Sequence, residues 1–327
     1  MTPANWRPSC DLRQLRFRAQ LLAAIRDFFQ SRNVMEVETP LLCHATGTDP
    51  QLDFFRSRFN FLPSRPTLFL QTSPEFAMKR LLAAGSGSIY QVCKAFRNGE
   101  SGRYHNPEFT ILEWYRVGFR LTDLMNEVAD LLMGLLSPHL SLQSVQIVSY
   151  QDIFVANTGL DPLSFQRRRY EQFALRNNMP EAIDICQDDH AMWLDLIFSL
   201  KVQPELGKDS VCLVHGYPAI QSSLARIKED DSRVAERFEV FVKGMELGNG
   251  FFELADASEQ EKRFDKEIVE RQVRQLPTVE KDERFLAALK HGLPDCSGVA
   301  IGLDRLLMII SGVETIDEVL AFPIARA

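Results

Sequence analysis

The sequence predicts an α+β fold in which a mostly antiparallel sheet is flanked by helices. Several candidate strands follow one another through short turns instead of crossover helices, which favours antiparallel pairing. Amphipathic helical patterns separate these groups of strands. No repeat or Gly/Ser-rich linker interrupts the chain, so we expect an N-terminal extension (1–10) and one catalytic-sized domain (11–327) with a helical insertion at about 150–210.

The N-terminal part predicts a helix and then a strand. The helix covers residues 11–33, where apolar residues recur at helical spacing: Leu15, Leu22, Ile25 and Phe29. Residues 34–40 (VMEVETP) predict a strand that stops at Pro40, because proline has no amide proton for a ladder.

Residues 68–85 predict a strand, a turn and a helix. Ser73 suits the N-cap, Pro74 the first helical position and Gly85 the C-terminal stop. The remaining elements are expected in this order: strands at 89–97 and 108–117, helix at 122–136, mostly helix at about 164–210, strand at 211–218, hairpin at 237–254, and a strand running into a helix at 297–312.

Composition narrows the function classes. The 327 residues are 45% hydrophobic and 25% charged, as in a globular protein, and the net charge of −7 offers no overall cationic field for nucleic acid. The six cysteines form no CxxC pair, which argues against a disulfide framework or structural zinc. With no apolar run of about 20 residues and no secretory signal, we expect a cytoplasmic protein without membrane contact.

The hairpin at 237–254 is the most informative segment. If Lys243 and Gly244 form its turn, Phe241 lies opposite Glu246, and Glu239 lies opposite Gly248. The two glutamates then share a face at about 7 Å, a separation that suits Mg²⁺ carrying nucleotide phosphates. A solvated sheet face with two unrelated acids is the alternative. The segment GNGFFEL (248–254) favours a ligand, because its glycines allow close approach to the backbone.

The strand predicted over 108–117 carries acidic and aromatic side chains on the same face. Phe109, Ile111, Glu113 and Tyr115 share that face, so an acid and a phenol lie two residues apart. With Glu75 and Glu253, they predict an anionic pocket for a diamine such as lysine, and a structural ion-pair network is the equally weighted alternative.

Two arginines are candidates for binding phosphate. Arg97 ends a strand before a loop rich in Gly, Asn and His, and Arg305 begins a helix after a glycine-flanked strand. His105 in the same loop is a further candidate, although a lone loop histidine more often makes local hydrogen bonds. The sequence has neither a GxxxxGK[ST] loop nor GxGxxG, so any ATP would bind without a P-loop or a dinucleotide fold.

Together these segments resemble the catalytic core of class II aminoacyl-tRNA synthetases of the lysyl branch, from about residue 11 to the C-terminus. VMEVETPLL resembles the first class II motif, FRNGESGRYHNPEFTILEWY (96–115) the second and GVAIGLDR (298–305) the third. RFEVFVKGMELGNGFFELADASEQ (237–260) is similar to the lysyl-type magnesium and substrate segment. The resemblance implies a homodimer that makes an aminoacyl-adenylate and pyrophosphate from ATP.

The resemblance also implies residue roles. By this resemblance, Arg97 and Arg305 are the catalytic residues and Phe109 stacks on adenine. Glu239 and Glu246 are the implied ligands of Mg²⁺. ATP binding is implied for Arg97, Asn98, Gly99, His105, Asn106, Phe109, Glu246, Leu247, Gly302 and Arg305. Binding of the lysine-like substrate is implied for Ser73, Pro74, Glu75, Glu113, Tyr115, Asn249, Glu253 and Ala300.

The sequence departs from the lysyl synthetases at three points. We expect no anticodon-binding domain, because only about ten residues precede the first predicted helix, and therefore no stable tRNA binding. The glutamate of the second motif is replaced by Gly99, with Glu100 next, and Ala300 replaces a glycine of the third. This pattern is similar to ligases that attach (R)-β-lysine to a lysine of translation elongation factor P, which the resemblance implies as acceptor.

Two further hypotheses remain open. One is lysyl-tRNA charging by a minimal synthetase, which the acidic charge disfavours. The other is a catalytically silent paralogue that senses an amino acid, which only Gly99 supports. Retention of both arginines and both metal carboxylates argues against a silent protein, because a binding-only protein needs no metal-ATP site.

Overall fold

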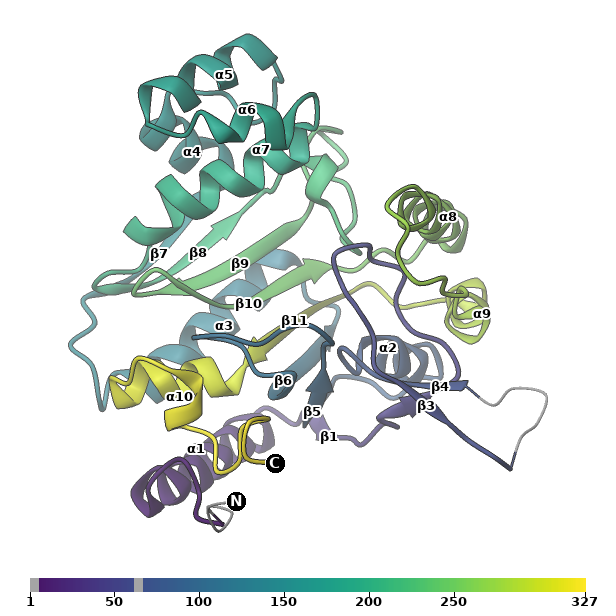
Figure 1. The fold of residues 1–327 in the computed structure, drawn as a ribbon. Helices are drawn as coiled ribbons and strands as arrows, with labels where there is room; N and C mark the ends of the chain where they lie inside the picture. The colour runs from purple at the N-terminus through teal and green to yellow at the C-terminus, as the bar shows by residue number, and fades with distance from the viewer. Residues whose placement is uncertain (1–5, 62–66) are drawn as a thin grey trace, which may run out of the picture. The chain divides into compact units, whose positions relative to one another are not determined.

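The structure, a computed structural model, describes residues 6–61 and 67–327. The chain forms two compact units (Figure 1). The first unit comprises Met1–Phe119 and Leu254–Ala327, and the second comprises Arg120–Glu253. The α+β prediction is confirmed.

The first unit contains four neighbouring strands in the order β1, β5, β6, β11. β1 pairs with β5 in parallel, whereas β5–β6 and β6–β11 are antiparallel. A second, small antiparallel sheet has the order β2, β4, β3. The bounds are β1 (Met35–Glu36), β2 (Leu42–Cys43), β3 (Arg56–Arg58), β4 (Thr67–Leu70), β5 (Ile89–Phe96), β6 (Glu108–Val117) and β11 (Cys296–Gly302).

The helices of this unit are α1 (Leu12–Gln30), α2 (Glu75–Ala83), α8 (Ala257–Val273), α9 (Glu283–His291), α10 (Leu303–Ser311) and the short η4 (Ile316–Glu318). Phe29 of α1 stacks on Tyr90 of β5 at 4.3 Å between ring centroids and meets Trp114 of β6 at 5.3 Å. Because Tyr90 and Trp114 face α1, the alternate residues Glu113 and Tyr115 lie on the other face of these strands.

The second unit contains strands in the order β10, β9, β8, β7. β9 pairs antiparallel with β8 and β10, and β7 is parallel to β8. The strands are β7 (Ser144–Ser149), β8 (Ser210–His215), β9 (Arg237–Val242) and β10 (Met245–Phe252). The helical elements are α3 (Leu121–Leu136), α4 (Tyr150–Thr158), α5 (Arg167–Arg176), α6 (Glu181–Cys186), α7 (His190–Ile197), η1 (Phe198–Val202), η2 (Gln203–Glu205) and η3 (Ala219–Gln221).

An apolar core joins α4–α7 to the strands of the second unit. Trp193, Phe154 and Tyr170 are fully buried in it and pack with Cys212, Val214 and Phe241 from β8 and β9. Side chains two residues apart along a strand share a face, so Arg237 and Glu239 of β9 lie on the same face as Phe241. The residues between them point to the other face.

Most predicted elements are confirmed, with three corrections. The strand predicted over 34–40 pairs only at Met35–Glu36, where β5 offers a partner. Helix α2 begins at Glu75, so Pro74 occupies the N-cap position instead of the first turn; the Ser73 hydroxyl still accepts the Glu75 N–H at 3.3 Å. Strand β7 was not predicted, whereas helix α4 lies within the helical insertion expected at about 150–210.

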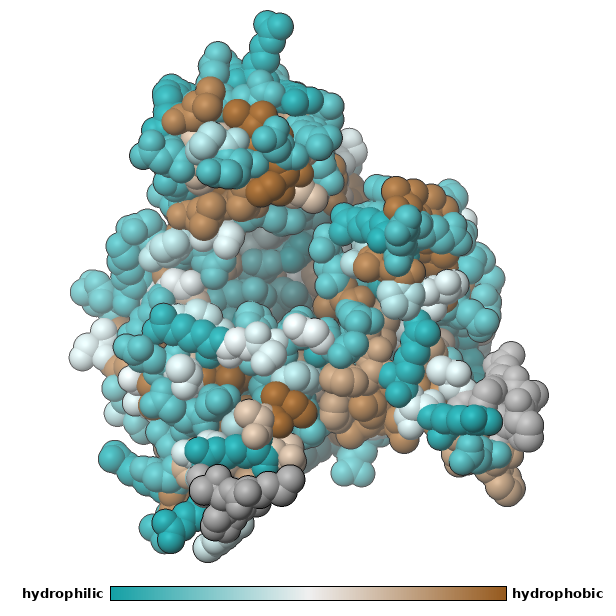
Figure 2. Space-filling view, viewed as in Figure 1, coloured by the Kyte–Doolittle hydropathy of each residue, from teal (hydrophilic) through white to brown (hydrophobic). Residues whose placement is uncertain are grey.

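Figure 2 shows a mostly hydrophilic surface with apolar areas over α5–α7 and over α8. Exposed apolar side chains there include Leu175, Ile185, Val269 and Val273. In the described part of the chain, no helix combines the length and apolarity that crossing a membrane would require.

Candidate active site

The β9–β10 hairpin forms the predicted two-residue turn but contains a bulge. Lys243 and Gly244 both have positive φ, 52° and 74°, as a tight hairpin turn requires. Glu246 lies opposite Phe241 as predicted. The expected pairing of Glu239 with Gly248 is wrong, because the register shifts between Glu246 and Gly248 and Leu247 is the extra residue.

The bulge changes which residues share a face. Asn249, instead of Gly248, lies opposite Glu239. Because opposed residues point to the same side, Asn249 joins Glu239 and Glu246 on one face, whereas a regular hairpin would have turned it away. The two glutamates share a face with or without the bulge, so that part of the prediction is confirmed.

Glu239 lies in a polar cluster, with 13% of its side chain exposed. Its Oε2 accepts a hydrogen bond from the Tyr217 hydroxyl at 2.6 Å, and its Oε1 accepts one from the Arg237 guanidinium. Burial raises the pKa of Glu239 to about 7; the Arg237 charge opposes the rise and the Glu246 carboxylate adds to it. The acid pair is therefore one that a cation would stabilise.

A row of side chains crosses three strands of the first unit. Glu113 in β6 lies directly opposite Gln91 in β5 and Ala300 in β11. The Tyr115 hydroxyl donates to Glu113 Oε1 at 2.7 Å, which confirms that the acid and the phenol share a face. Opposite Tyr115 lies Gly298, so small residues of β11 border a nearly fully buried carboxylate.

Glu75 and Glu253 occupy different surroundings. The Glu75 carboxylate forms an ion pair with Lys79 one turn further along α2, at 2.6 Å, and Lys79 is itself 1% exposed. Glu75 therefore has a cationic partner within its own helix. Glu253, in the second unit, is buried and forms an isolated bridge with Ala225.

Arg97 directly follows β5 and lies beside Phe109. Its guanidinium is 5.1 Å from the centroid of the Phe109 ring, and Nη1 is 3.5 Å from Glu100 Oε1. Its buried Nε has no hydrogen-bond partner among the described residues. The neighbouring Asn98 donates to Asp53 Oδ2 at 2.7 Å, and Gly99 adopts φ 79°, which favours glycine.

Arg305 lies in the first turn of α10, as predicted. Its Nη2 is 2.6 Å from His105 Nε2, and its Nε donates to the Tyr104 carbonyl at 3.4 Å. Gly302, at the N-cap of α10, lies opposite Ile111. Asp304, which directly precedes Arg305, accepts a hydrogen bond from the Thr110 N–H at 2.7 Å and pairs with Arg18, which fixes the start of the helix against β6.

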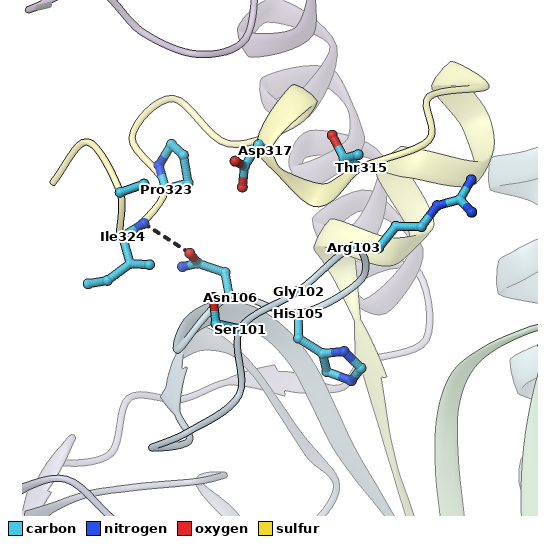
Figure 3. A pocket seen from close by; sticks show the side chains of 10 residues that line it. Ser101, Gly102, Arg103, His105, Asn106, Thr315, Asp317, Pro323 and Ile324 are labelled. Atoms are coloured by element: carbon cyan, nitrogen blue, oxygen red, sulfur yellow. Dashed lines mark hydrogen bonds between the residues drawn. The ribbon is translucent and has the colours of Figure 1, made fainter.

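Asn106 is tied to the C-terminal segment. Its Nδ2 donates to the Glu108 carbonyl at 2.5 Å, and its Oδ1 accepts the Ile324 N–H at 3.0 Å. Figure 3 shows the bond between Asn106 and Ile324, which lies at a pocket of about 290 Å³. The pocket is lined by Ser101, Gly102, Arg103, His105, Asn106, Thr315, Asp317, Pro323, Ile324 and Ala325.

The structure adds residues that the sequence analysis missed. Arg237 and Tyr217 contact Glu239, and Gln91 lies beside Glu113. Arg237 and Gln91 could have been noticed as polar residues within apolar strands. Tyr217 carried no signal, because its contact with Glu239 spans 22 residues. Within the described ranges, no three His, Cys, Asp or Glu side chains form a cluster suited to a metal ion.

Comparisons with known proteins agree with this architecture. Residues 6–326 match the family described as tRNA synthetases class II (D, K and N). A protein of Hamiltonella defensa subsp. Acyrthosiphon pisum (strain 5AT), named "Elongation factor P--(R)-beta-lysine ligase", is 47% identical over 326 residues, 99% of each chain. Proteins of that name from Pectobacterium carotovorum (strain PC1) and Yersinia enterocolitica are also 47% identical, covering 99% of this chain and 98% and 99% of theirs. The chain therefore belongs to the class II tRNA synthetases of the D, K and N type.

Proposed function

We propose that the chain activates (R)-β-lysine with ATP and transfers it to a lysine side chain of elongation factor P. The observation that carries the proposal is the set of relatives bearing that activity in their name, at 47% identity over 99% of this chain. The paired Glu113 and Tyr115 support it, since a buried carboxylate bordered by small residues suits a substrate amine.

The reaction has two steps. A carboxylate oxygen of the amino acid attacks the α-phosphorus of ATP, and pyrophosphate leaves. The acceptor amine, having lost a proton, then attacks the carbonyl carbon of the adenylate, so that an amide forms and AMP leaves. Arg97 and Arg305 present guanidinium donors to the phosphate oxygens, where negative charge develops.

The base and sugar of ATP are assigned to the first unit. Phe109 offers a ring face for adenine, and Arg305, held by His105, offers a planar cation. Asn106 is assigned to the nucleotide site, and its bonds to Glu108 and Ile324 hold the loop that carries it. Asn98, Gly99 and Gly302 complete the nucleotide contacts proposed for the first unit, and Leu247, next to Glu246, is the contact proposed for the second.

Mg²⁺ is assigned to Glu239 and Glu246. The residues fit this ion, because they are carboxylates on one face and burial together with Glu246 raises the pKa of Glu239. Two carboxylates leave most of an octahedral shell to phosphate and water oxygens, as expected for Mg²⁺ delivered with ATP. When bound, the ion would neutralise charge on the phosphates.

We further propose a homodimer, on the resemblance of VMEVETPLL to the dimer strand of this family, and a cytoplasmic location, where elongation factors act. Size-exclusion chromatography with light scattering tests the dimer. A monomer at all concentrations would refute it.

An exchange assay separates the candidate functions. ATP–pyrophosphate exchange is measured with α-lysine and with (R)-β-lysine, and transfer of labelled amino acid is measured to elongation factor P and to lysine tRNA. We expect exchange to favour β-lysine and label to appear on elongation factor P. Label on tRNA alone would favour the minimal synthetase, and no exchange with any lysine isomer would favour the silent paralogue.

The metal assignment has its own test. Glu246→Gln keeps the side-chain volume but removes a charge, so we expect exchange to be nearly abolished while the thermal midpoint stays close to that of the parent protein. Unchanged exchange at limiting Mg²⁺ would remove this glutamate from the metal site.

A further inference from the structure

We propose that Tyr217 and Arg237 are positioning residues that fix the orientation of Glu239 for the metal carried by ATP. The inference rests on the proposed assignment of Mg²⁺ to Glu239. All the residues that carry it lie in the second unit.

Each oxygen of the Glu239 carboxylate receives one donor from the protein. The Tyr217 hydroxyl binds Oε2 at 2.6 Å, and the Arg237 guanidinium binds Oε1. The two donors thus determine how the carboxylate plane is turned. Each oxygen keeps one further acceptor site, which is what a metal ligand needs.

The two donors are themselves held in place. Arg237 Nη1 donates to the Gln221 carbonyl at 2.5 Å, and its guanidinium lies 4.6 Å from the centroid of the Tyr217 ring. Gln221 in turn donates to Asp195 of α7 at 2.6 Å. A chain of contacts therefore runs from α7 through Gln221 and Arg237 to Glu239.

The same cluster provides a matched control. Tyr150 is 1% exposed and its ring lies 4.7 Å from that of Tyr217. Its hydroxyl has no hydrogen-bond partner among the residues that the structure describes. Tyr150→Phe and Tyr217→Phe thus remove the same atom from the same aromatic cluster, but only Tyr217→Phe removes a donor to Glu239.

The test measures how strongly metal and ATP binding depend on each other. Calorimetry gives the Kd of ATP with saturating Mg²⁺ and with EDTA, in the absence of any amino acid. The ratio of these constants reports the contribution of the metal. In Tyr217→Phe we expect that ratio to fall about ten-fold, and the Mg²⁺ concentration for half-maximal exchange to rise about ten-fold with kcat nearly retained. For Tyr150→Phe, both the Kd ratio and the Mg²⁺ concentration for half-maximal exchange should stay within about two-fold of the values for the parent protein.

Arg237→Lys provides a second variant, in case Tyr217→Phe does not fold. Lysine keeps the charge but cannot hold Gln221 and Glu239 with one planar fork, so the same direction of change is expected. Equal effects of Tyr217→Phe and Tyr150→Phe, or an unchanged ratio in both Tyr217→Phe and Arg237→Lys, would overturn the proposal. Lack of exchange with every lysine isomer would refute the proposed function only, because the calorimetric ratio needs no amino acid.

Discussion

Ala300→Gly tests how the floor of the lysine-like site selects the position of the substrate amine. Ala300 lies directly opposite Glu113, and the alternate residues of β11 on that face, Gly298 and Gly302, have no side chain. The Ala300 methyl is therefore the only β-carbon that this stretch of the strand presents beside Glu113. We expect it to exclude α-lysine in favour of β-lysine.

The expected size follows from one methyl group. A methylene-scale change in a pocket alters discrimination by about 1–3 kcal/mol, or roughly 5- to 150-fold in relative kcat/KM. We expect Ala300→Gly to raise kcat/KM for α-lysine within that range relative to β-lysine. Glycine inside a strand costs about 0.5–1 kcal/mol of unfolding free energy, so the thermal midpoint should fall by only about 1–3 °C.

Pyrophosphate exchange with each isomer measures this effect, and Ala95→Gly is the matched control. Ala95 is a fully buried alanine in β5, opposite Phe109 and away from Glu113. Ala95→Gly should change kcat/KM for α-lysine and for β-lysine by the same factor. If Ala300→Gly leaves the ratio of the two kcat/KM values unchanged, or if the parent protein does not prefer β-lysine, the steric reasoning fails.

Three other predictions follow from local geometry. Gly99→Glu should lower the unfolding free energy by about 1–2 kcal/mol without increasing exchange, because φ is 79° there although a β-carbon would meet no atom within 4 Å; a gain in exchange would contradict it. Asn106→Ala should raise the KM for ATP and lower the thermal midpoint, because a buried N–H and a carbonyl lose their partners; an unchanged KM would exclude a role in shaping the loop. Burial raises the pKa of Glu267 to about 7, so its folded form favours the proton and the parent protein should lose stability as the pH rises from about 4.5 through 7. Glu267→Gln should remove the part of that loss that comes from Glu267. If the unfolding free energies of the two proteins change equally with pH between about pH 5 and pH 8, the assignment is refuted.

Local patterns determined most elements of the fold. Strands β5 and β6 follow from alternation, α10 from its glycine-preceded helical pattern, and the hairpin turn from Lys243 and Gly244 between apolar strands. These features depend on interactions between residues close in sequence, which periodicity and turn preferences record. For the same reason, the shared face of Glu239 and Glu246 could be predicted, since it depends only on strand period and on the pairing next to the turn.

Tertiary structure decided the partners of the site residues. The bulge at Leu247 turned Asn249 onto the face of the two glutamates, although nothing in the spacing distinguishes a bulge from a regular register. The bond between Asn106 and Ile324 joins residues 218 apart in the chain, and Tyr217 reaches Glu239 only because β9 packs beside the segment after β8. Such contacts depend on how strands and loops that are distant in sequence pack together. The donors and acceptors of a side chain do not specify which distant group will bond to them.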